Sequence, residues 1–126
     1  MRSGKFRNSK LVGKKGEEIA QEFFERKGFE ILEKNYKRKF FEIDLIVKKR
    51  NKIHFVEVKT ILFPSQISAE EHLNQSKLKK IKNGALFYLR EKKIDFERFE
   101  VQIDFLAIEI FLKLKKAKIR WLQGVY

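Results

Sequence analysis

Four charged residues stand at alternate positions in two segments that are otherwise rich in β-branched and aromatic residues: Glu42, Asp44, Glu57 and Lys59. Two carboxylates held close together repel each other, and a hard divalent cation would remove that repulsion. Mg²⁺ suits such a place because it takes oxygen ligands, often one or two carboxylates together with a substrate phosphate. A lysine nearby would stabilise developing negative charge. These residue types could therefore hydrolyse a phosphodiester bond.

The two segments are expected to form a β-hairpin. With a two-residue turn at 50–51, Asp44 lies directly opposite Glu57, and Glu42 lies opposite Lys59. Side chains two positions apart share a face of a sheet, so all four charged groups would point the same way. The same spacing also occurs on solvated sheet faces, which leaves a structural role open. The opposite face would carry the core residues Ile43, Leu45, Val47, Val56 and Val58.

Helices and strands are expected on both sides of this hairpin. In chain order they are a helix after Gly16 that ends at Gly28, strands at 29–36, 40–48 and 53–61, a helix at 69–92, and strands at 99–110 and 118–123. Three consecutive strands favour an antiparallel meander, and a long helix before the next strand favours a right-handed crossover to a parallel neighbour. The predicted fold class is α/β, an α+β mixed sheet flanked by helices.

Each predicted helix carries a charged residue at an unusual place. Glu17 follows the helical spacing of Ala20 and Phe24, which puts its carboxylate on the border of the buried stripe. Lys77 shares its stripe with Ile81. A lysine that only meets solvent is not expected there. Both side chains are therefore candidates for the same site as the hairpin residues.

The charge balance predicts the kind of partner. Thirty Lys and Arg stand against seventeen Asp and Glu in 126 residues, a net charge of +13. Such an excess attracts polyanions, among which phosphate backbones are common, so nucleic acid is the expected partner. A lysine-rich surface that only keeps the protein in solution is the alternative. The 43% of hydrophobic residues indicates a folded domain, expected at 13–126 after a basic flexible leader at 1–12.

Some function classes are excluded or disfavoured by composition. The chain has no Cys, which excludes disulfides, thiolate zinc sites and thiol catalysis. It has neither a signal-peptide pattern nor an apolar run long enough for a membrane helix, so a cytoplasmic protein without a membrane partner is expected. His54 and His72 are expected on the polar surface. Trp121, Tyr88 and Tyr126 are expected in core packing rather than in base stacking.

An ordered series of short motifs runs from Gly13 towards the C-terminus: Gly13-Lys14-Lys15-Gly16-Glu17, Ala20, Gly28, Asn35, Glu42-Ile43-Asp44-Leu45-Ile46, Phe55-Val56-Glu57-Val58-Lys59, Lys77 and Asp104. In these motifs the chain resembles the small YraN-type proteins of the PD-(D/E)XK nuclease-like superfamily. The resemblance implies a restriction-endonuclease-like core, α-β-β-β-α-β with a small terminal β addition. That core is similar in fold to archaeal Holliday-junction resolvases.

The resemblance also implies roles for individual residues. It makes Asp44 the central metal ligand and Glu57 the second, with the backbone carbonyl of Val58 as a third. Lys59 would be the catalytic lysine, and Glu17 the acid that the first helix adds to the site. The implied metal is Mg²⁺ or Mn²⁺.

Two further residues would support that site, and two others depart from the family's pattern. Glu42 would pair with Lys59, and Lys77 would reach the site or a phosphate. Phe41 stands where the family usually has Gly, and Ile61 where it has Arg. The expected function is metal-dependent cleavage of nucleic acid, expected to be DNA, including branched DNA, with homodimerisation as an open question. The alternatives are a basic nucleic-acid-binding module that does not cleave, and an adaptor for a protein partner.

Overall fold

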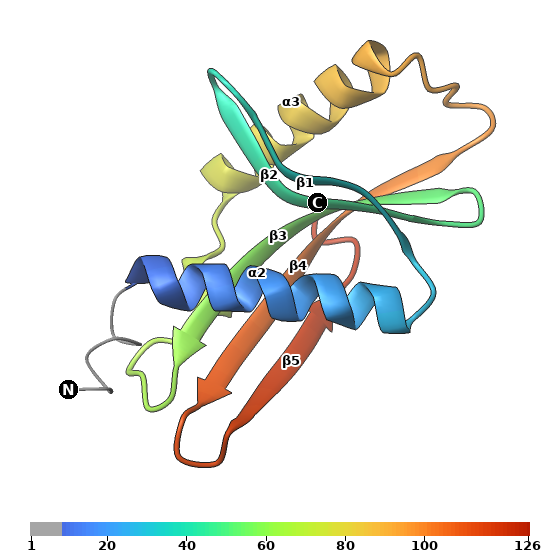
Figure 1. Cartoon of the computed structure of the whole chain (residues 1–126). Helices are drawn as coiled ribbons and strands as arrows, with labels where there is room; N and C mark the ends of the chain where they lie inside the picture. The colour runs from blue at the N-terminus through green and yellow to red at the C-terminus, as the bar shows by residue number, and fades with distance from the viewer. Residues whose placement is uncertain (1–8) are drawn as a thin grey trace.

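The computed structural model describes residues 9–126 of the chain. In chain order the elements are α2 (Ser9–Arg26), β1 (Glu30–Arg38), β2 (Phe41–Lys49), β3 (Lys52–Leu62), the 3₁₀ turn η1 (Glu70–His72), α3 (Gln75–Glu91), β4 (Glu100–Phe111) and β5 (Lys116–Leu122) (Figure 1). No helix in residues 9–126 is long and apolar enough to cross a membrane.

All five strands belong to one sheet, in the order β1-β2-β3-β4-β5. Neighbouring strands are antiparallel except for β3 and β4, which are parallel. The connection through α3 makes that parallel pair possible, because a strand that returns in the same direction needs a long crossover. The predicted fold class, the mixed sheet and the order of the elements are confirmed.

One helix packs on each face of the sheet (Figure 1). The buried core under α2 comprises Ala20, Phe24, Leu45, Val47, Val56, Leu106, Ile108 and Ile110. The core under α3 comprises Tyr36, Ile43, Ile46, Ile53, Phe55, Leu78, Ile81, Ala85, Tyr88, Leu89 and Ile103. Since both faces of the central strands are covered, the buried residues of β3 and β4 are apolar except for His54 and Asp104, and a polar group there needs a partner.

The observed elements differ most from the predictions at the two helices. The first helix begins at Ser9, so residues 9–12 of the predicted leader are helical, and residues 1–8 lie outside the described part of the chain. The predicted helix at 69–92 is instead the turn η1 followed by α3. The break lies at Asn74, whose side chain accepts a 2.9 Å hydrogen bond from the Lys77 N–H and so caps α3. Asn is among the preferred residues for this capping position.

The sheet opens between β2 and β3. Their pairing runs from Lys49 opposite Lys52 to Leu45 opposite Val56, and within residues 9–126 it goes no further. Strand β3 nevertheless continues beside β4 as far as Leu62. Strand β2 continues beside β1 to Phe41. The hairpin of β1 and β2 therefore leaves the sheet and leans towards α3 (Figure 1).

This opening changes which way the residues of β2 point. The two-residue turn at 50–51 and its register are as predicted, since Lys49 faces Lys52. The prediction that Ile43 shares the face of Leu45 is wrong, because Ile43 packs in the α3 core and Leu45 in the α2 core. The alternation of the strand breaks at Asp44, where the hairpin turns away from β3.

The other half of the sheet is joined through one buried carboxylate, Asp104 on β4. Its Oδ2 lies 2.7 Å from His54 Nδ1 on β3 and accepts a 2.9 Å hydrogen bond from Trp121 Nε1 on β5. Its Oδ1 accepts hydrogen bonds from Gln102 Nε2 at 2.7 Å and from the Gly124 N–H at 3.0 Å. Both carboxylate oxygens are thus fully used, and three strands and the C-terminal segment meet at one side chain.

These partners reverse the usual effect of burial on an acid. Burial alone would raise the pKa of Asp104, but hydrogen bonds from His54, Gly124 and Trp121 outweigh it and hold the pKa below its usual range. The prediction that His54 lies on the polar surface is wrong, because His54 is buried against Asp104. Trp121 is half-buried and packs against Phe24, in line with the predicted packing role.

We predict that Asp104→Asn lowers the free energy of unfolding by about 3 kcal/mol at neutral pH, because it leaves buried donors without their charged acceptor. The pKa of Asp104 in the folded protein lies below its ordinary value. The ionised carboxylate therefore stabilises the fold at pH values above that ordinary value, and this stabilisation is lost as pH falls through the folded pKa. The difference between wild type and variant should therefore shrink in acid. Urea denaturation across pH measures it, with the exposed Glu22→Gln as control. Equal stability at neutral pH would contradict the prediction.

Candidate metal and nucleic-acid site

The centre of the candidate site is Asp44, at the point where β2 and β3 part. The backbone N–H of Val58 on β3 donates a 2.8 Å hydrogen bond to Asp44 Oδ2. The side chain of Asp44 thus satisfies a backbone donor of β3 beyond the last pair of facing residues. A backbone donor in such a place needs an acceptor, so the aspartate helps the strands to part.

The electrostatic surroundings of Asp44 are unfavourable to its charge. Burial is the largest effect, the negative charge of Glu57 the next, and with a smaller effect from Glu17 they raise the pKa of Asp44 to about 8, against the opposing hydrogen bond from Val58. A raised pKa of this kind is expected when a second acid, and not a base, lies next to a partly buried carboxyl group. The pair of Asp44 and Glu57 would gain from a positive charge between them.

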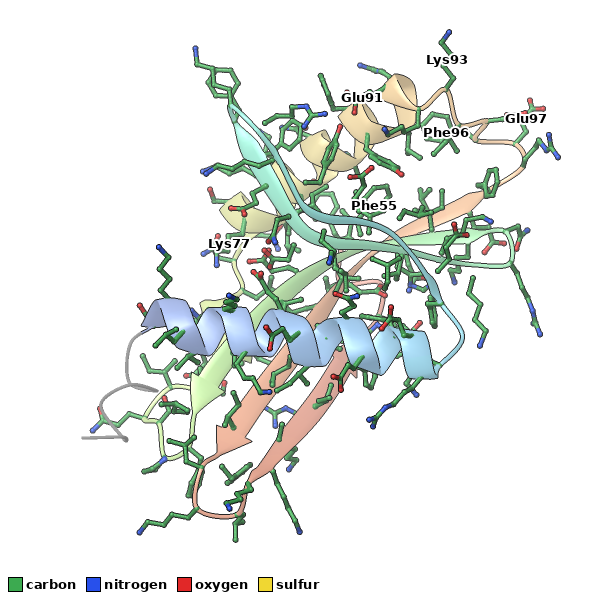
Figure 2. The ribbon with its side chains drawn as sticks, in the orientation of Figure 1. Phe55, Lys77, Glu91, Lys93, Phe96 and Glu97 are labelled. Carbon is green, nitrogen blue, oxygen red and sulfur yellow. The ribbon has the colours of Figure 1, made fainter. Side chains whose placement is uncertain are left out.

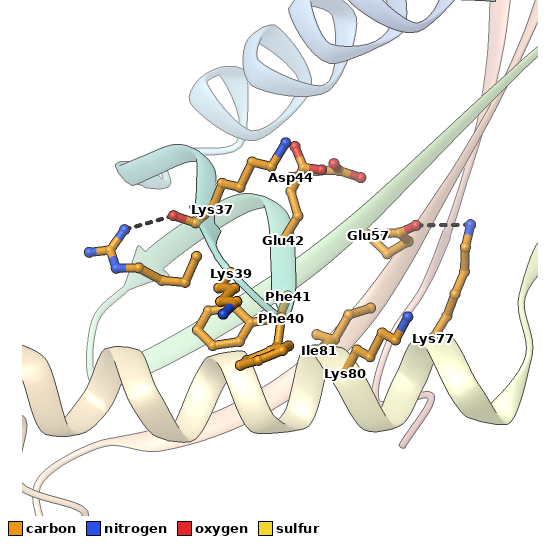
Figure 3. A pocket seen from close by; sticks show the side chains of 11 residues that line it. Lys37, Lys39, Phe40, Phe41, Glu42, Asp44, Glu57, Lys77, Lys80 and Ile81 are labelled. Carbon is orange, nitrogen blue, oxygen red and sulfur yellow. Dashed lines mark hydrogen bonds and ion pairs between the residues drawn. The ribbon is translucent and has the colours of Figure 1, made fainter.

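Lys77 supplies one positive charge to this pair. Its Nζ lies 3.4 Å from Glu57 Oε2, and the Lys77 side chain is more exposed than that of Glu57. Lys77 lies in the first turn of α3, which the Asn74 cap holds in place. Lys77 projects from the start of α3 (Figure 2), and its ammonium group reaches Glu57 at the edge of the candidate site (Figure 3).

A cleft of about 440 Å³ opens above the acidic pair, between the β1–β2 hairpin and α3. Glu42, Asp44 and Glu57 form its acidic part (Figure 3). Basic side chains from the hairpin and from α3 also line it: Lys37, Arg38, Lys39, Lys77 and Lys80. The cleft thus combines a negative interior with positive walls, which is the charge pattern of a site that holds a cation and receives a polyanion.

Glu17, on α2, approaches Asp44 from the opposite face of the sheet to Lys77. It lines a second, smaller opening together with Asn35 and Asp44. Burial raises the pKa of Glu17, a hydrogen bond from the Asn35 side chain lowers it, and the charges of Glu42 and Glu57 raise it again, with a net rise. The first-helix acid is thus electrostatically coupled to the hairpin acids.

Asn35 was not assigned a role from the sequence, although it stands in the motif series. Its backbone has a positive φ of 51°, a conformation that Asn tolerates better than most residues. In the sequence, an Asn in the middle of a predicted strand was the one sign that the backbone at position 35 is irregular. The conformation lies in β1 next to the bend of the hairpin, and the Asn35 side chain contacts Glu17.

Lys59 does not lie in the cleft with the acidic pair. It lines a groove between β3 and the start of α2, together with Glu17 and Val58. Across residues 9–126 no ion pair joins Glu42 to Lys59, because the two strands separate before these positions. The structure therefore brings Glu42, Asp44, Glu57 and Lys77 together and leaves Lys59 at a neighbouring opening.

The donor set fits a cation that takes few protein ligands. In the part of the chain that the structure describes, no three His, Cys, Asp or Glu side chains are grouped closely enough to hold a metal ion by themselves. Two carboxylates stand together, and the backbone carbonyl of Val58 is next to Glu57 in the chain. Mg²⁺ is commonly held by one or two carboxylates, with water and substrate phosphate as the other ligands. The residues therefore fit Mg²⁺ or Mn²⁺ better than a fully protein-ligated metal.

The contact between α2 and β3 determines where Glu17 lies. Gly16 is buried against Thr60, and a Cβ atom at position 16 would collide with the Thr60 side chain. Only glycine lets the helix lie this close to the strand. At Gly13, one turn earlier, a Cβ atom would meet no side chain or other element within 4 Å among residues 9–126.

We predict that Asp44→Asn stabilises the protein at neutral pH in the absence of divalent cations, by about 1 kcal/mol. The raised folded pKa means that wild type loses stability as pH rises from the ordinary carboxyl range towards about 8, whereas an amide does not titrate. Asparagine can still accept the Val58 N–H. Mg²⁺ should raise the melting temperature of wild type more than that of the variant. A variant less stable than wild type at neutral pH would contradict this prediction.

We predict opposite effects for two glycines of α2. Gly16→Ala should destabilise the protein by about 1–3 kcal/mol, because the added methyl group forces the helix away from Thr60. Gly13→Ala should stabilise it by up to about 1 kcal/mol through helix propensity. Chemical denaturation measures both changes. Combining Gly16→Ala with Thr60→Ala should recover part of the loss, and no recovery would contradict the proposed contact.

Comparison with known proteins gives one family. The model of the uncharacterised protein family UPF0102 matches residues 16–108, a segment that contains both carboxylates of the pair. A UPF0102 protein of Clostridium perfringens is 31% identical over 118 residues, 94% of this chain and 95% of the relative. Relatives from Marinomonas sp. (34% over 116 residues, 90% and 87%) and Dictyoglomus turgidum (36% over 117 residues, 90% and 93%) are similar. The chain belongs to the UPF0102 family, the YraN-type family that its motifs predicted.

Proposed function

We propose that this protein is a divalent-metal-dependent nuclease that hydrolyses phosphodiester bonds in nucleic acid, with DNA as the expected substrate. The observation that carries the proposal is the pair of Asp44 and Glu57, partly buried together at the inner end of a cleft with basic walls. Such a pair weakens the fold unless it binds something. Residues that oppose stability in this way cluster at functional sites.

The arrangement of charge supports a polyanionic substrate. The chain carries a net charge of +13, and lysines from two separate elements line the cleft around the acids. A phosphate backbone that enters the cleft would meet Lys37 and Lys80 on its walls beside the carboxylates. Its phosphate would then complete the ligands of a cation that the two acids hold in part.

The chain's own residues would hold and orient the reacting groups. When bound, the divalent cation supplies Lewis acidity towards the scissile phosphate. The carboxylates of Asp44 and Glu57 concentrate negative charge at one point, and the Val58 N–H keeps Asp44 oriented. Lys77 Nζ neutralises Glu57 when no substrate is bound and is exposed enough to turn to a phosphate oxygen.

Two lysines are candidates for stabilising the negative charge that develops in the reaction. Lys59 is the one that the family resemblance implies, and it would act from the groove that it shares with Glu17. Lys77 lies nearer to Glu57. Comparing Lys59→Ala with Lys77→Ala distinguishes them, because loss of the reacting lysine lowers kcat, whereas loss of a phosphate contact mainly raises KM.

Two observations favour the alternative of a basic module that binds nucleic acid without cleaving it. The ion pair between Lys77 and Glu57 already gives one acid a positive partner. The raised pKa of Asp44 lets the other acid carry a proton near neutral pH. In that reading the two acids are tolerated without a cation.

We predict that wild type cleaves DNA with Mg²⁺ or Mn²⁺ and that Asp44→Ala reduces the rate by at least about 10²-fold, because the site loses its central ligand. The assay uses linear duplex, single-stranded and four-way-junction DNA, with binding measured in parallel. Affinity should change little in the variant and should fall steeply as salt rises. Glu22→Gln, at an exposed carboxylate of α2, is the control.

Cleavage that survives Asp44→Ala unchanged would reject this site. Absence of cleavage by wild type, with salt-sensitive binding in both proteins, would favour the binding module. Weak binding with little dependence on salt would instead favour a protein partner.

A further inference from the structure

The turn between β1 and β2 exposes an aromatic side chain. Phe40 follows Lys39 at the tip of the hairpin, and 75% of its surface is accessible, more than for any other large hydrophobic residue in positions 9–126. Turns usually carry Gly, Pro, Asn, Asp or Ser, so the backbone does not require a phenylalanine here. Single exposed apolar residues are common on proteins, and Phe40 becomes informative only through its neighbours.

Those neighbours are aromatic and basic. The Lys39 Nζ lies 5.3 Å from the Phe40 ring centre. Arg38 lies over the Tyr36 ring at 4.5 Å and within 5.7 Å of the ring of Phe87, a side chain of α3 that is itself 44% exposed. The hairpin tip and the adjacent turn of α3 thus form one aromatic and basic surface, which we call the hairpin ridge: Arg38, Lys39, Phe40, Phe41 and Phe87.

The hairpin ridge is held rigidly on α3. The Phe41 ring lies against Gly84, where a Cβ atom would come within 2.6 Å of Phe41 Cδ1. Its ring centre is 5.6 Å from that of Phe87. Arg38 Nη2 donates to both carboxylate oxygens of Glu91 on α3, at 2.9 Å to Oε2 and 3.1 Å to Oε1. A surface fixed in this way loses little freedom when it binds a ligand.

The hairpin ridge continues into the cleft. Residues 37–41 line the same cleft as Asp44 and Glu57 (Figure 3). A strand of nucleic acid whose phosphates follow Lys37 and Lys80 towards the acids would therefore carry its bases past Phe40. Bases within a duplex are already stacked on their neighbours, so only an unpaired base can stack on an exposed phenyl ring.

We propose that the hairpin tip is a stacking site for an unpaired base, and that the cleft takes nucleic acid with single-stranded or splayed bases beside the phosphate it holds. The inference rests on the proposed function only in taking the cleft as the nucleic-acid site. The positive charge of Lys39 beside the Phe40 ring favours a partner that is both aromatic and negatively charged. A base attached to a phosphate has both properties, whereas an apolar peptide has no negative charge. Any duplex would bind through phosphate contacts alone.

The test is fluorescence anisotropy with labelled oligonucleotides in EDTA, where no cleavage takes place. We expect Phe40→Ala to weaken binding of a single-stranded oligonucleotide about ten-fold, the size of one lost stacking contact. Binding of a blunt duplex of the same sequence should change less than about two-fold, because phosphate contacts remain. Phe40→Trp should retain or strengthen single-strand binding.

The matched control is Phe96→Ala. Phe96 is also exposed, at 55%, but it lies in the connection after α3, away from the residues that line the cleft (Figure 2). It should leave both affinities unchanged. Equal thermal stability of the Phe40 variants and wild type shows that any effect is on binding.

Three results would overturn the inference: no loss of single-strand affinity in Phe40→Ala, an equal loss on duplex, or the same loss in Phe96→Ala. A tip that serves a protein partner would give the first of these. A single-strand defect in Phe40→Ala would support the inference even if Mg²⁺ produced no cleavage. Cleavage that depends on Asp44, together with unchanged single-strand affinity in Phe40→Ala, would leave the nuclease in place and remove the stacking site.

Discussion

The arrangement of the cleft depends on the hydrogen bond that the Val58 N–H donates to Asp44. In an uninterrupted sheet the backbone donors of β3 would be satisfied by β2. Here a side chain provides the acceptor, so β2 can turn away without leaving a buried donor unsatisfied. The hairpin then leans on α3, and the cleft lies between them. The acid that permits the opening is therefore also the acid at its centre.

Two aspartates on the strands that flank β3, Asp44 on β2 and Asp104 on β4, show how hydrogen-bond partners and nearby charges decide the pKa of the same side chain. Asp104 receives four hydrogen bonds, and its pKa is lowered although it is fully buried. Asp44 receives one backbone hydrogen bond and faces two other acids, and its pKa is raised. The hydrogen bonds of Asp104 join β3, β4 and β5. The unfavourable acidic pair lies on the other side of β3, where the sheet opens. A fold can keep an unfavourable pair at a functional site when the rest of the structure holds it in place.

The sequence predicted those features that depend on local pattern. The order of the elements, the turn at 50–51 and the mixed sheet follow from alternation, helical spacing and connection length. It did not predict the opening at Asp44, because a pattern of alternation assumes that pairing continues to the end of a strand. The reversed direction of Ile43 and the separation of Lys59 from Glu42 both follow from that opening. His54 was assigned to the surface because its partner Asp104 lies 50 positions away, and no local spacing reveals such a pair.

The packing of Phe41 at the hairpin depends on a glycine elsewhere in the fold. Its ring lies over Gly84 in the middle of α3, and a larger residue at 84 would leave no room for it. Glycine is unfavourable within a helix, so its presence there indicates a packing requirement. The Phe41 ring thus occupies the space that a side chain at position 84 would fill. Because Phe41 is packed on α3, the residues before it, from Lys37 to Phe40, stand at the outer edge of the cleft. The contact of Phe41 with Gly84 therefore holds the hairpin ridge beside the acidic pair.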